Sequence, residues 1–268
     1  MHVRRPAVLL TVAAVLLLGA AFVVVVVARQ PPSAGATTPD AGAIEAAPAS
    51  TADLPTESSP AVGALFVDGA HYCTASVVHS RQGDVLLTAA HCIHDGEGGE
   101  YLTGVTFAPG YHDGVAPFGY WTVSDELVAP GWSDSSDQDL DVGFATAHQV
   151  GTTESLESLV GANTLATGGA FEQAITLTGY PDDSETPAVC QNTTSRQDTF
   201  QLKVDCAGFP TGTSGGPWVT GQDPKTRLGT VIGVIGGFEY GGDDPDTSYS
   251  SYFDTDVQAL YRQTAARA

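Results

Sequence analysis

The chain has 268 residues, with 10 lysines and arginines against 31 aspartates and glutamates, which gives a formal net charge of −21. This balance argues against binding to DNA or RNA, because the phosphates would be repelled. The length suits one large β domain, since β-barrel proteins often reach about 200–250 residues. The 31 glycines suit short strands joined by tight turns.

Residues 1–28 read as a membrane-targeting segment. Arg4 and Arg5 precede an unbroken apolar run from Pro6 to Ala28. This run is longer than the apolar region of a signal peptide, which is usually about 7–15 residues, and it reaches the about 20 residues that span a bilayer. Its length favours an uncleaved anchor with its basic end in the cytoplasm, and a cleaved signal peptide is the alternative. Either interpretation predicts export, as a secreted protein or one held at the outer face of the membrane.

Residues 29–60 are rich in Pro, Ala, Ser and Thr and have no hydrophobic period, which predicts a disordered linker. Residues 61–268 are predicted to form one all-β domain, because short apolar stretches alternate with turn signals such as Asp68-Gly69. The predicted strands cover residues 62–67, 73–78, 85–88, 104–108, 120–128, 142–145, 174–180, 199–206, 215–220, 228–235 and 248–253.

A helix is predicted to close the chain. Thr255 and Gln258 have the spacing of a capping box, in which Thr255 is the N-cap. Val257, Leu260 and Tyr261 would then form its apolar face.

The four cysteines are Cys73, Cys92, Cys190 and Cys206. Four cysteines permit three pairings, and the sequential pairing closes two short loops. No CxxC occurs and no further ligand stands at a zinc spacing, so we predict neither a metal nor another cofactor. The acidic stretches 95–100 and 243–246 do not match the spacing of a calcium-binding EF-hand and are predicted to be solvated turns.

Three motifs indicate nucleophilic catalysis. Ser214 lies in Gly-Thr-Ser-Gly-Gly-Pro (212–217), where glycines allow positive φ and successive N–H groups converge on one point. A serine hydroxyl is a weak nucleophile that needs an adjacent base, and His91 in Thr-Ala-Ala-His-Cys (88–92) is the candidate. A carboxylate from Asp141 would orient the histidine, with Asp139 as its rival.

At these motifs the chain resembles the trypsin/chymotrypsin-like serine peptidases, whose catalytic residues also follow in the order His, Asp, Ser. The stretches 73–78, 178–181 and 231–237 make it most similar to the secreted, glutamyl-endopeptidase-like bacterial members. The resemblance implies two six-stranded antiparallel β-barrels followed by a C-terminal helix. It also implies a serine endopeptidase that needs no cofactor and acts on protein or peptide substrates, and we expect a monomer.

The resemblance also implies the role of each residue. Ser214 would be the nucleophile, His91 the base and Asp141 the orienting carboxylate, preferred over Asp139 because small and apolar residues follow it as in the family. The backbone N–H groups of Gly212 and Ser214 would form the oxyanion hole. The first two cysteines would be paired beside the histidine.

Two departures from family patterns bear on activation and specificity. Thr213 stands where the animal digestive enzymes have an aspartate that pairs with a new N-terminus, so we predict activity without such a pairing. Ile235 stands where glutamyl enzymes have a histidine, and Gly208 where trypsin has an aspartate, so we predict a small or apolar specificity pocket. The segment from Ile235 through Gly236 to Gly237 is predicted to pair with the substrate backbone.

Two alternatives use the same cleft. An esterase would have the same catalytic residues but hydrolyse only esters. A catalytically inactive module would hold a peptide without cutting it, and its expected mark is loss of a catalytic residue. All three candidates are present in the sequence.

Overall fold

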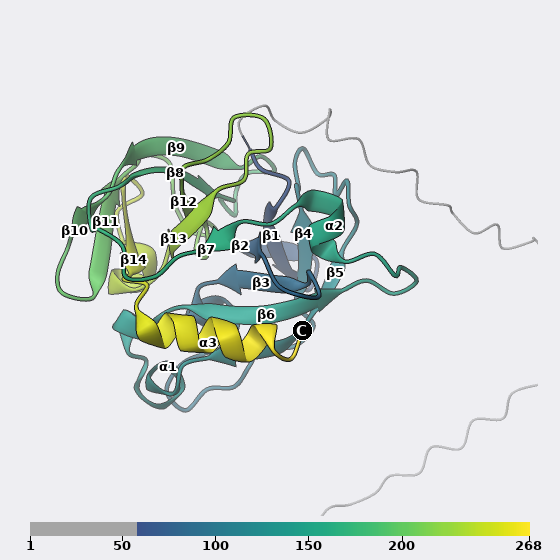
Figure 1. Cartoon of the computed structure of the whole chain (residues 1–268), viewed down its shortest axis with the longest axis horizontal. Coiled ribbons are helices and arrows are strands. Elements are labelled where there is room, and N and C mark those ends of the chain that lie inside the picture. The colour runs from purple at the N-terminus through teal and green to yellow at the C-terminus, as the bar shows by residue number, and fades with distance from the viewer. Residues whose placement is uncertain (1–57) are drawn as a thin grey trace, which may run out of the picture. The chain divides into compact units, whose positions relative to one another are not determined.

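The computed structural model describes residues 58–268, and strands make up most of the regular secondary structure in this part of the chain (Figure 1). The predicted targeting segment and residues 29–57 of the predicted linker lie outside the described residues. Among the helices that the structure describes, none combines the length and the apolar character needed to cross a bilayer.

The first half forms a closed antiparallel barrel. Its strands follow one another around the barrel in the order β1-β2-β3-β6-β5-β4. Leu65 pairs with Cys73 on one side and Phe107 on the other, and Leu65, Phe107 and Trp121 fill the interior almost without solvent exposure. The strands are β1 (Val62–Val67), β2 (Ala70–Val78), β3 (Val85–Thr88), β4 (Thr106–Pro109), β5 (Trp121–Val128) and β6 (Gly143–His148).

The second half consists of two sheets around one core. A five-stranded sheet has the order β7-β13-β12-β8-β9, and a three-stranded sheet has the order β10-β11-β14. Leu177 and Trp218 from the first sheet pack with Leu202 from the second. The strands are β7 (Thr164–Leu165), β8 (Ala174–Gly179), β9 (Ala188–Thr193), β10 (Ser195–Arg196), β11 (Gln201–Asp205), β12 (Pro217–Thr220), β13 (Thr230–Val234) and β14 (Thr247–Ser251).

The second half thus corresponds to the second barrel of the expected fold, with regular pairing interrupted at two junctions. Between β9 and β11 the chain is joined by the Cys190–Cys206 disulfide. Between β13 and β14 the Val234 N–H donates to the Ser250 hydroxyl at 3.0 Å, and just beyond β13 the Gly236 N–H donates to the Tyr249 carbonyl oxygen at 3.0 Å. The two sheets thus enclose one core although they do not join into a closed barrel.

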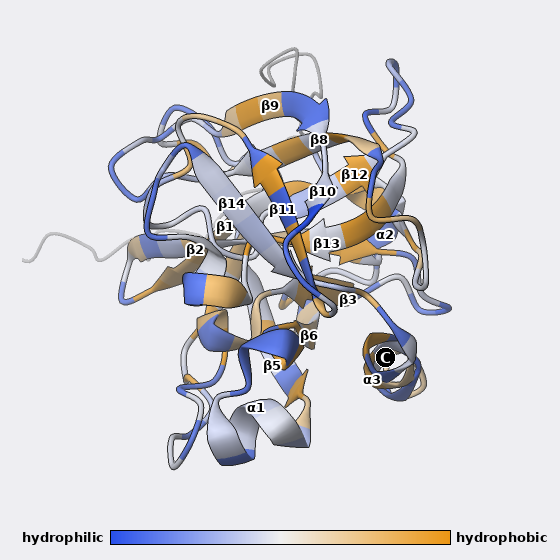
Figure 2. Ribbon diagram, turned by 90° about the vertical axis from the view of Figure 1, so that its left-hand side faces the viewer, coloured by the Kyte–Doolittle hydropathy of each residue, from blue (hydrophilic) through white to orange (hydrophobic). Residues whose placement is uncertain are grey.

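The most hydrophobic segments lie mainly on strands such as β8, β11 and β12, whereas much of the loop surface is hydrophilic (Figure 2). Strand β14 is pale in this view because its sequence is Thr-Ser-Tyr-Ser-Ser. Ser248, Ser250 and Ser251 are nevertheless buried, with at most 1% of their surface exposed. A strand rich in buried serines is poorly marked by hydrophobicity, yet it borders the site described below.

The C-terminal helix α3 (Thr255–Ala265) returns the chain to the first barrel. Val257 and Leu260 pack on Phe144 of β6, and the helix lies beside β6 in Figure 1. The predicted capping box is wrong by one residue, because Asp254 is the N-cap and its carboxylate accepts from the Asp256 and Val257 N–H groups. A carboxylate is as good an N-cap as a threonine hydroxyl, and Asp254 has the extended backbone that an N-cap needs.

The predicted strands are present with ends shifted by a few residues, but β7, β9 and β10 were not expected. Strand β9 lies at a sheet edge and carries Gln191, Asn192 and Thr193, so it lacks the alternation that marks a half-buried strand. Five short helical segments were also not expected: α1 (Pro130–Ser135), α2 (Leu156–Val160) and the 3₁₀ turns η2 (Ala90–Cys92), η3 (Gln138–Leu140) and η4 (Phe238–Gly241).

Candidate active site

His91 and Asp141 lie in two separate segments of the first half, and their side chains are in contact. His91 is in η2, just after β3, and Asp141 follows η3 and leads into β6. The Asp141 carboxylate is fully buried and accepts from the His91 ring Nδ1 at 2.8 Å and from the His91 backbone N–H at 2.9 Å. The Gly237 N–H adds a third bond at 2.9 Å. These bonds offset the cost of burying the charge.

The direction of the His91–Asp141 bond follows from the chemistry of its two groups. A carboxylate oxygen only accepts, so Nδ1 of the neutral ring carries the proton and Nε2 keeps its lone pair. The His91 side chain is 19% exposed. The histidine therefore presents a basic nitrogen on the side away from Asp141.

Two residues of β2, Tyr72 and Cys73, bind the turn that carries His91. Cys73 and Cys92 form a disulfide, and Cys190 and Cys206 form the other, so the sequential pairing is confirmed. The Tyr72 hydroxyl donates to the Cys92 carbonyl oxygen at 2.6 Å. Burial, with a smaller effect of the Glu126 carboxylate, raises the pKa of Tyr72 far above its ordinary value, so the phenol stays a donor.

The disulfide also bears on metal binding. The sulfurs of Cys73 and Cys92 and a ring nitrogen of His91 lie within 4.8 Å of one another, a spacing that could suit a metal ion. Because the two sulfurs are bonded to each other, neither is a thiolate, which is the form that binds metals. This cluster does not fit a metal ion in the oxidised protein.

Ser214 lies in a turn in which the next position, residue 215, accepts only glycine. Gly215 has a φ of +81°, and a Cβ there would overlap the Thr74 carbonyl oxygen and the Thr88 hydroxyl. The Ser214 carbonyl oxygen accepts from the Thr74 N–H at 2.7 Å. The turn is thus pressed against the first barrel, and this close approach fixes the serine at the junction of the two halves.

Two N–H groups of this turn have no partner. Neither Gly212 N nor Ser214 N donates a hydrogen bond within the part of the chain that the structure describes. The other N–H groups that follow in the turn are used, since Thr213 N donates to Pro210 O, Gly215 N to Ile235 O and Gly216 N to Thr213 O. Gly212 has a φ of +93°. The two unpaired donors are those that the sequence predicted for an oxyanion hole.

His91 and Ser214 line one pocket of about 310 Å³. Its wall includes the apolar side chains of Phe209 and Ile235, both at most 5% exposed. Glu239 and Asp243, both exposed, contribute carboxylates to its lining. The Ser214 hydroxyl makes no hydrogen bond to the histidine ring or to any other described residue. The pocket thus brings the predicted nucleophile and base together without joining them by a hydrogen bond.

The rival carboxylate lies elsewhere. Asp139 accepts from the Gln201 amide at 2.8 Å and makes no contact with the histidine. Among the five other histidines that the structure describes, none lines the pocket. Three of them, His71, His94 and His112, are buried, with 5–9% exposure.

The predicted substrate-pairing segment uses its N–H groups internally. Gly236 N donates to Tyr249 O at 3.0 Å and Gly237 N to Asp141. The Gly236 carbonyl oxygen accepts no hydrogen bond from a described residue. Gly208 does not line the pocket, and its neighbour Phe209 does.

An aromatic wall beside His91 was not expected from the sequence. Tyr240, half exposed, packs edge-on against the His91 ring at a centroid distance of 5.7 Å and against Trp132 at 6.1 Å. Glu239 and Tyr240 both have positive φ, 53° and 55°. Such strained backbone costs on the order of 1–3 kcal/mol per residue and tends to occur at functional sites.

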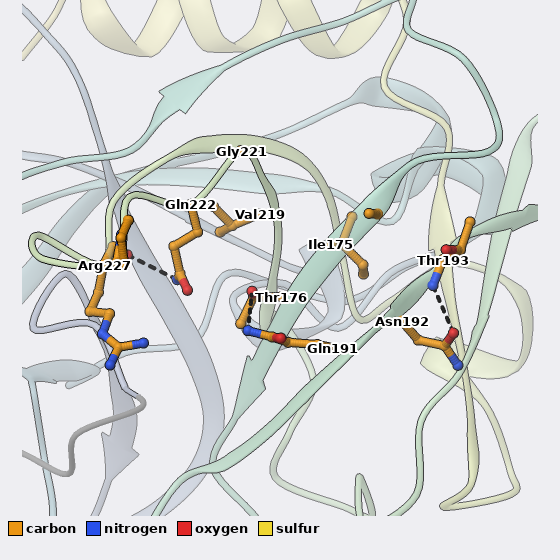
Figure 3. A pocket seen from close by; sticks show the side chains of 11 residues that line it. Ile175, Thr176, Gln191, Asn192, Thr193, Val219, Gly221, Gln222 and Arg227 are labelled. Carbon is orange, nitrogen blue, oxygen red and sulfur yellow. Dashed lines mark hydrogen bonds between the residues drawn. The ribbon is translucent and has the colours of Figure 1, made fainter.

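A larger pocket of about 420 Å³ lies away from this site (Figure 3). It is formed by β8, β9, β12 and the loop after β12, and Gln191, Gln222 and Arg227 are among its polar side chains. None of the three candidate catalytic residues lines it. Size alone therefore does not identify the reactive site.

Comparison with solved structures gives relatives for this fold. Protease Anisep from Arthrobacter nicotinovorans is 26% identical, with a TM-score of 0.69, over 80% of this chain and 98% of that one. A thermostable serine protease, AL20, from an extremophilic microorganism is 25% identical, with a TM-score of 0.70, over 80% of this chain and all of that one. A Glu endopeptidase shares the fold at 16% identity and a TM-score of 0.60, over 77% of this chain and 91% of that one.

No family model matches the sequence, and no curated protein matches it. The structural likeness nevertheless covers nearly the whole of each relative. It confirms the resemblance predicted from the three motifs. The chain therefore has the trypsin-like fold, and its likeness to two serine proteases of this fold supports a serine-type endopeptidase.

Proposed function

We propose that this protein is an exported serine endopeptidase that cleaves peptide bonds with a triad of Ser214, His91 and Asp141. The observation that carries the proposal is the position of His91. Its Nδ1 is bonded to a buried carboxylate, and its ring lines the same pocket as the serine. The two unpaired N–H groups next to the serine add a place for developing negative charge.

The proposed reaction has two stages. His91 Nε2 removes the proton from the Ser214 hydroxyl as the oxygen attacks the substrate carbonyl, and Asp141 stabilises the resulting imidazolium. The carbonyl oxygen becomes an oxyanion that accepts from Gly212 N–H and Ser214 N–H, and the protonated histidine then gives its proton to the leaving amine. Water, deprotonated by the same histidine, hydrolyses the acyl-enzyme and restores the serine.

The oxyanion hole is worth a large share of the rate. Loss of one such donor typically costs about 3–4 kcal/mol of transition-state stabilisation. Because both donors here are backbone groups without a competing partner, they need no rearrangement to receive the oxyanion. The serine–histidine hydrogen bond would form with substrate in place, since catalytic hydrogen bonds are often long in free enzymes.

Substrate recognition follows from the pocket. Phe209 and Ile235 favour a small or apolar side chain beside the cleaved bond. The Gly236 carbonyl oxygen would accept an N–H from the substrate backbone. Thr213 is held within its own loop, where its hydroxyl donates to Pro210 O at 2.7 Å, so no N-terminal ammonium is needed to order this turn.

The two disulfides support export, because disulfides persist in oxidising compartments. We propose that the protein acts as a monomer outside the cytoplasm, secreted or held to the membrane by residues 1–28. N-terminal sequencing of the exported protein would distinguish an uncleaved anchor from a cleaved signal peptide.

The test is covalent labelling of the full chain with a fluorophosphonate probe, which reacts with an activated serine. We expect the wild type to be labelled and Ser214→Ala and His91→Ala to be inert. Ser133→Ala, an alteration of a partly exposed serine on α1, is the matched control and should be labelled like the wild type. Labelling that persists in Ser214→Ala would overturn the assignment of the nucleophile.

One observation favours a second candidate, a trypsin-fold module that binds peptides or hydrolyses only esters. The Ser214 hydroxyl is not hydrogen-bonded to His91. A module of the binding kind would bind peptides without probe labelling or turnover. An esterase would be labelled and would hydrolyse p-nitrophenyl esters, yet leave a peptide library intact.

A further inference from the structure

Gln201 is a buried polar side chain beside the candidate site. It lies at the start of β11, in the second half of the protein, and only 1% of its surface is exposed. Its amide nitrogen donates to the Gln138 carbonyl oxygen at 2.9 Å and to the Asp139 carboxylate at 2.8 Å. Its amide oxygen accepts from the Phe238 N–H at 3.1 Å. Both ends of the amide are thus satisfied.

The partners of Gln201 lie on both sides of Asp141. Gln138 and Asp139 are in η3, the turn that leads directly into Asp141. Phe238 follows Gly237, whose N–H donates to the Asp141 carboxylate oxygen that also accepts from His91. One amide therefore joins the turn before Asp141 to the segment that donates to Asp141.

The packing around Gly237 leaves no room for a side chain at this position. Gly237 has a φ of +81°, and a Cβ at this position would overlap the Gln201 amide oxygen. The Ser251 hydroxyl of β14 also donates to the Gln138 carbonyl oxygen, at 3.0 Å. The carboxylate of Asp141 is thus held by neighbours whose own positions depend on strands of the second half.

We propose that Gln201 is a positioning residue for catalysis: through η3 and Gly237 it fixes the Asp141 carboxylate against the His91 ring. The inference rests on the proposed triad and adds a residue to which neither the motifs nor the pocket assigned a role. Gln201 does not line the pocket. Its loss should lower kcat and leave KM little changed.

The physical reason is geometric. Without the amide, η3 loses a donor at Gln138 and Asp139, and the Phe238 N–H loses its acceptor, so both supports of Asp141 gain freedom. A misplacement of about 1 Å from a change outside the reacting groups can lower a rate on the order of 100-fold. The substrate wall formed by Phe209 would keep its shape.

The experiment uses the full chain and compares Gln201→Leu with Gln201→Glu. The leucine removes all three hydrogen bonds. The glutamate keeps the shape and the acceptor for Phe238, but places a carboxylate against the Asp139 carboxylate with no proton between them. For both we expect kcat on a peptide substrate to fall by up to about 100-fold, with a parallel fall in the fluorophosphonate labelling rate.

A double variant that exchanges donor and acceptor between residues 139 and 201 distinguishes a positioning role from a general loss of structure. In the double variant Asp139→Asn/Gln201→Glu, the asparagine amide can donate to the glutamate, so the contact at position 139 is restored with its polarity exchanged, although the donor to the Gln138 carbonyl oxygen is not. We expect this variant to recover part of the kcat that Gln201→Glu loses. Gln191→Glu, the same charge change at an exposed glutamine of β9, is the control and should match the wild type. Thermal unfolding checks that each variant is folded.

The outcomes separate this inference from the proposed function. Wild-type kcat in Gln201→Glu, a loss confined to KM, or a folded double variant that recovers nothing would each overturn the positioning role while the triad stands. Should Gln201→Leu fail to fold, Gln201→Glu and the double variant decide. An unlabelled wild type would overturn the proposed function and this inference with it.

Discussion

The Thr74 hydroxyl of the first barrel donates a hydrogen bond of 3.2 Å to the carbonyl oxygen of Gly212, in the turn that carries the candidate nucleophile. The same hydroxyl accepts from Tyr180 N at 2.8 Å, and Thr74 N donates to Ser214 O at 2.7 Å. Thr74 is fully buried. A single residue of β2 therefore binds the carbonyl groups of both residues whose N–H groups are proposed to form the oxyanion hole.

Thr74→Val should reduce turnover, because the isosteric side chain leaves the Gly212 oxygen and the Tyr180 N–H without a partner. A buried polar group left unsatisfied costs about 1–3 kcal/mol, so we expect the free energy of unfolding to fall by that order and kcat to fall with it. Thr74→Ser keeps the hydroxyl and should retain activity. Denaturant unfolding and peptide hydrolysis measure the two effects, and equal activity in the valine and serine variants would contradict the prediction.

Asp141→Asn should abolish most activity without unfolding the protein. An asparagine can keep the bond from the His91 backbone N–H, but an amide nitrogen in place of the oxygen that His91 and Gly237 share favours the wrong tautomer of His91, so Nε2 would carry the proton. In a trypsin-fold protease the corresponding change lowers kcat by about 10⁴-fold, and we expect a loss of that order. Asp134→Asn, at an exposed position of α1, is the control, and activity similar to this control would exclude Asp141 as the orienting carboxylate.

Removal of the Cys73–Cys92 disulfide should weaken both the fold and the site. The two cysteines are 19 positions apart, and closing a loop of that size stabilises a protein by about 3 kcal/mol. Cys73→Ser/Cys92→Ser should lose about that much and also lose labelling, since the bond holds the turn of His91.

Cys190→Ser/Cys206→Ser is the matched comparison, with a separation of 16 positions. We expect a similar loss of stability but a smaller loss of activity, because this disulfide joins β9 to the end of β11 away from the pocket. Chemical denaturation and labelling rates measure both variants. A larger activity loss in this second variant would contradict the expected order.

Asp223 should give the protein a pH-dependent contribution to stability. Its carboxylate accepts from the Thr226 and Lys225 N–H groups, both at 2.8 Å, and these bonds hold the pKa of Asp223 below its ordinary value. A depressed pKa in the folded state stabilises the protein above the unfolded-state pKa, and this is lost as the pH falls through the folded-state pKa.

Asp223→Ala should therefore have a lower Tm than the wild type at neutral pH, with the difference shrinking in acid. Circular dichroism melts over a pH series measure it. Asp183→Ala, at an exposed aspartate, serves as control. A Tm difference that grows as the pH falls would contradict the assignment.

Ile235→Ala should enlarge the pocket on its apolar side. The Ile235 side chain is 3% exposed and lines the pocket with Ser214. Removing it would shift preference toward larger apolar side chains beside the cleaved bond, since pocket volume limits what can enter. Cleavage-site profiling on a peptide library measures the shift, and an unchanged profile would show that Ile235 does not shape specificity.

The sequence by itself determined the fold family and the local parts of the site. The order of His91, Asp141 and Ser214, each within a short motif, was sufficient to predict the trypsin-like fold. Glycines around Ser214 indicated a tight turn, because only glycine tolerates that backbone. These signals are local, and they depend on a residue and its immediate neighbours.

Only the tertiary structure decided which hydrogen-bond partners the residues of the site have. It distinguished Asp141 from Asp139, which lie two positions apart but face His91 and Gln201 respectively. It also placed Thr74 beside Gly212, 138 positions away in the chain. Such contacts leave little trace in one sequence, because a hydroxyl or an amide can bond to any nearby partner. Only packing of the two halves against each other selects which partner that is.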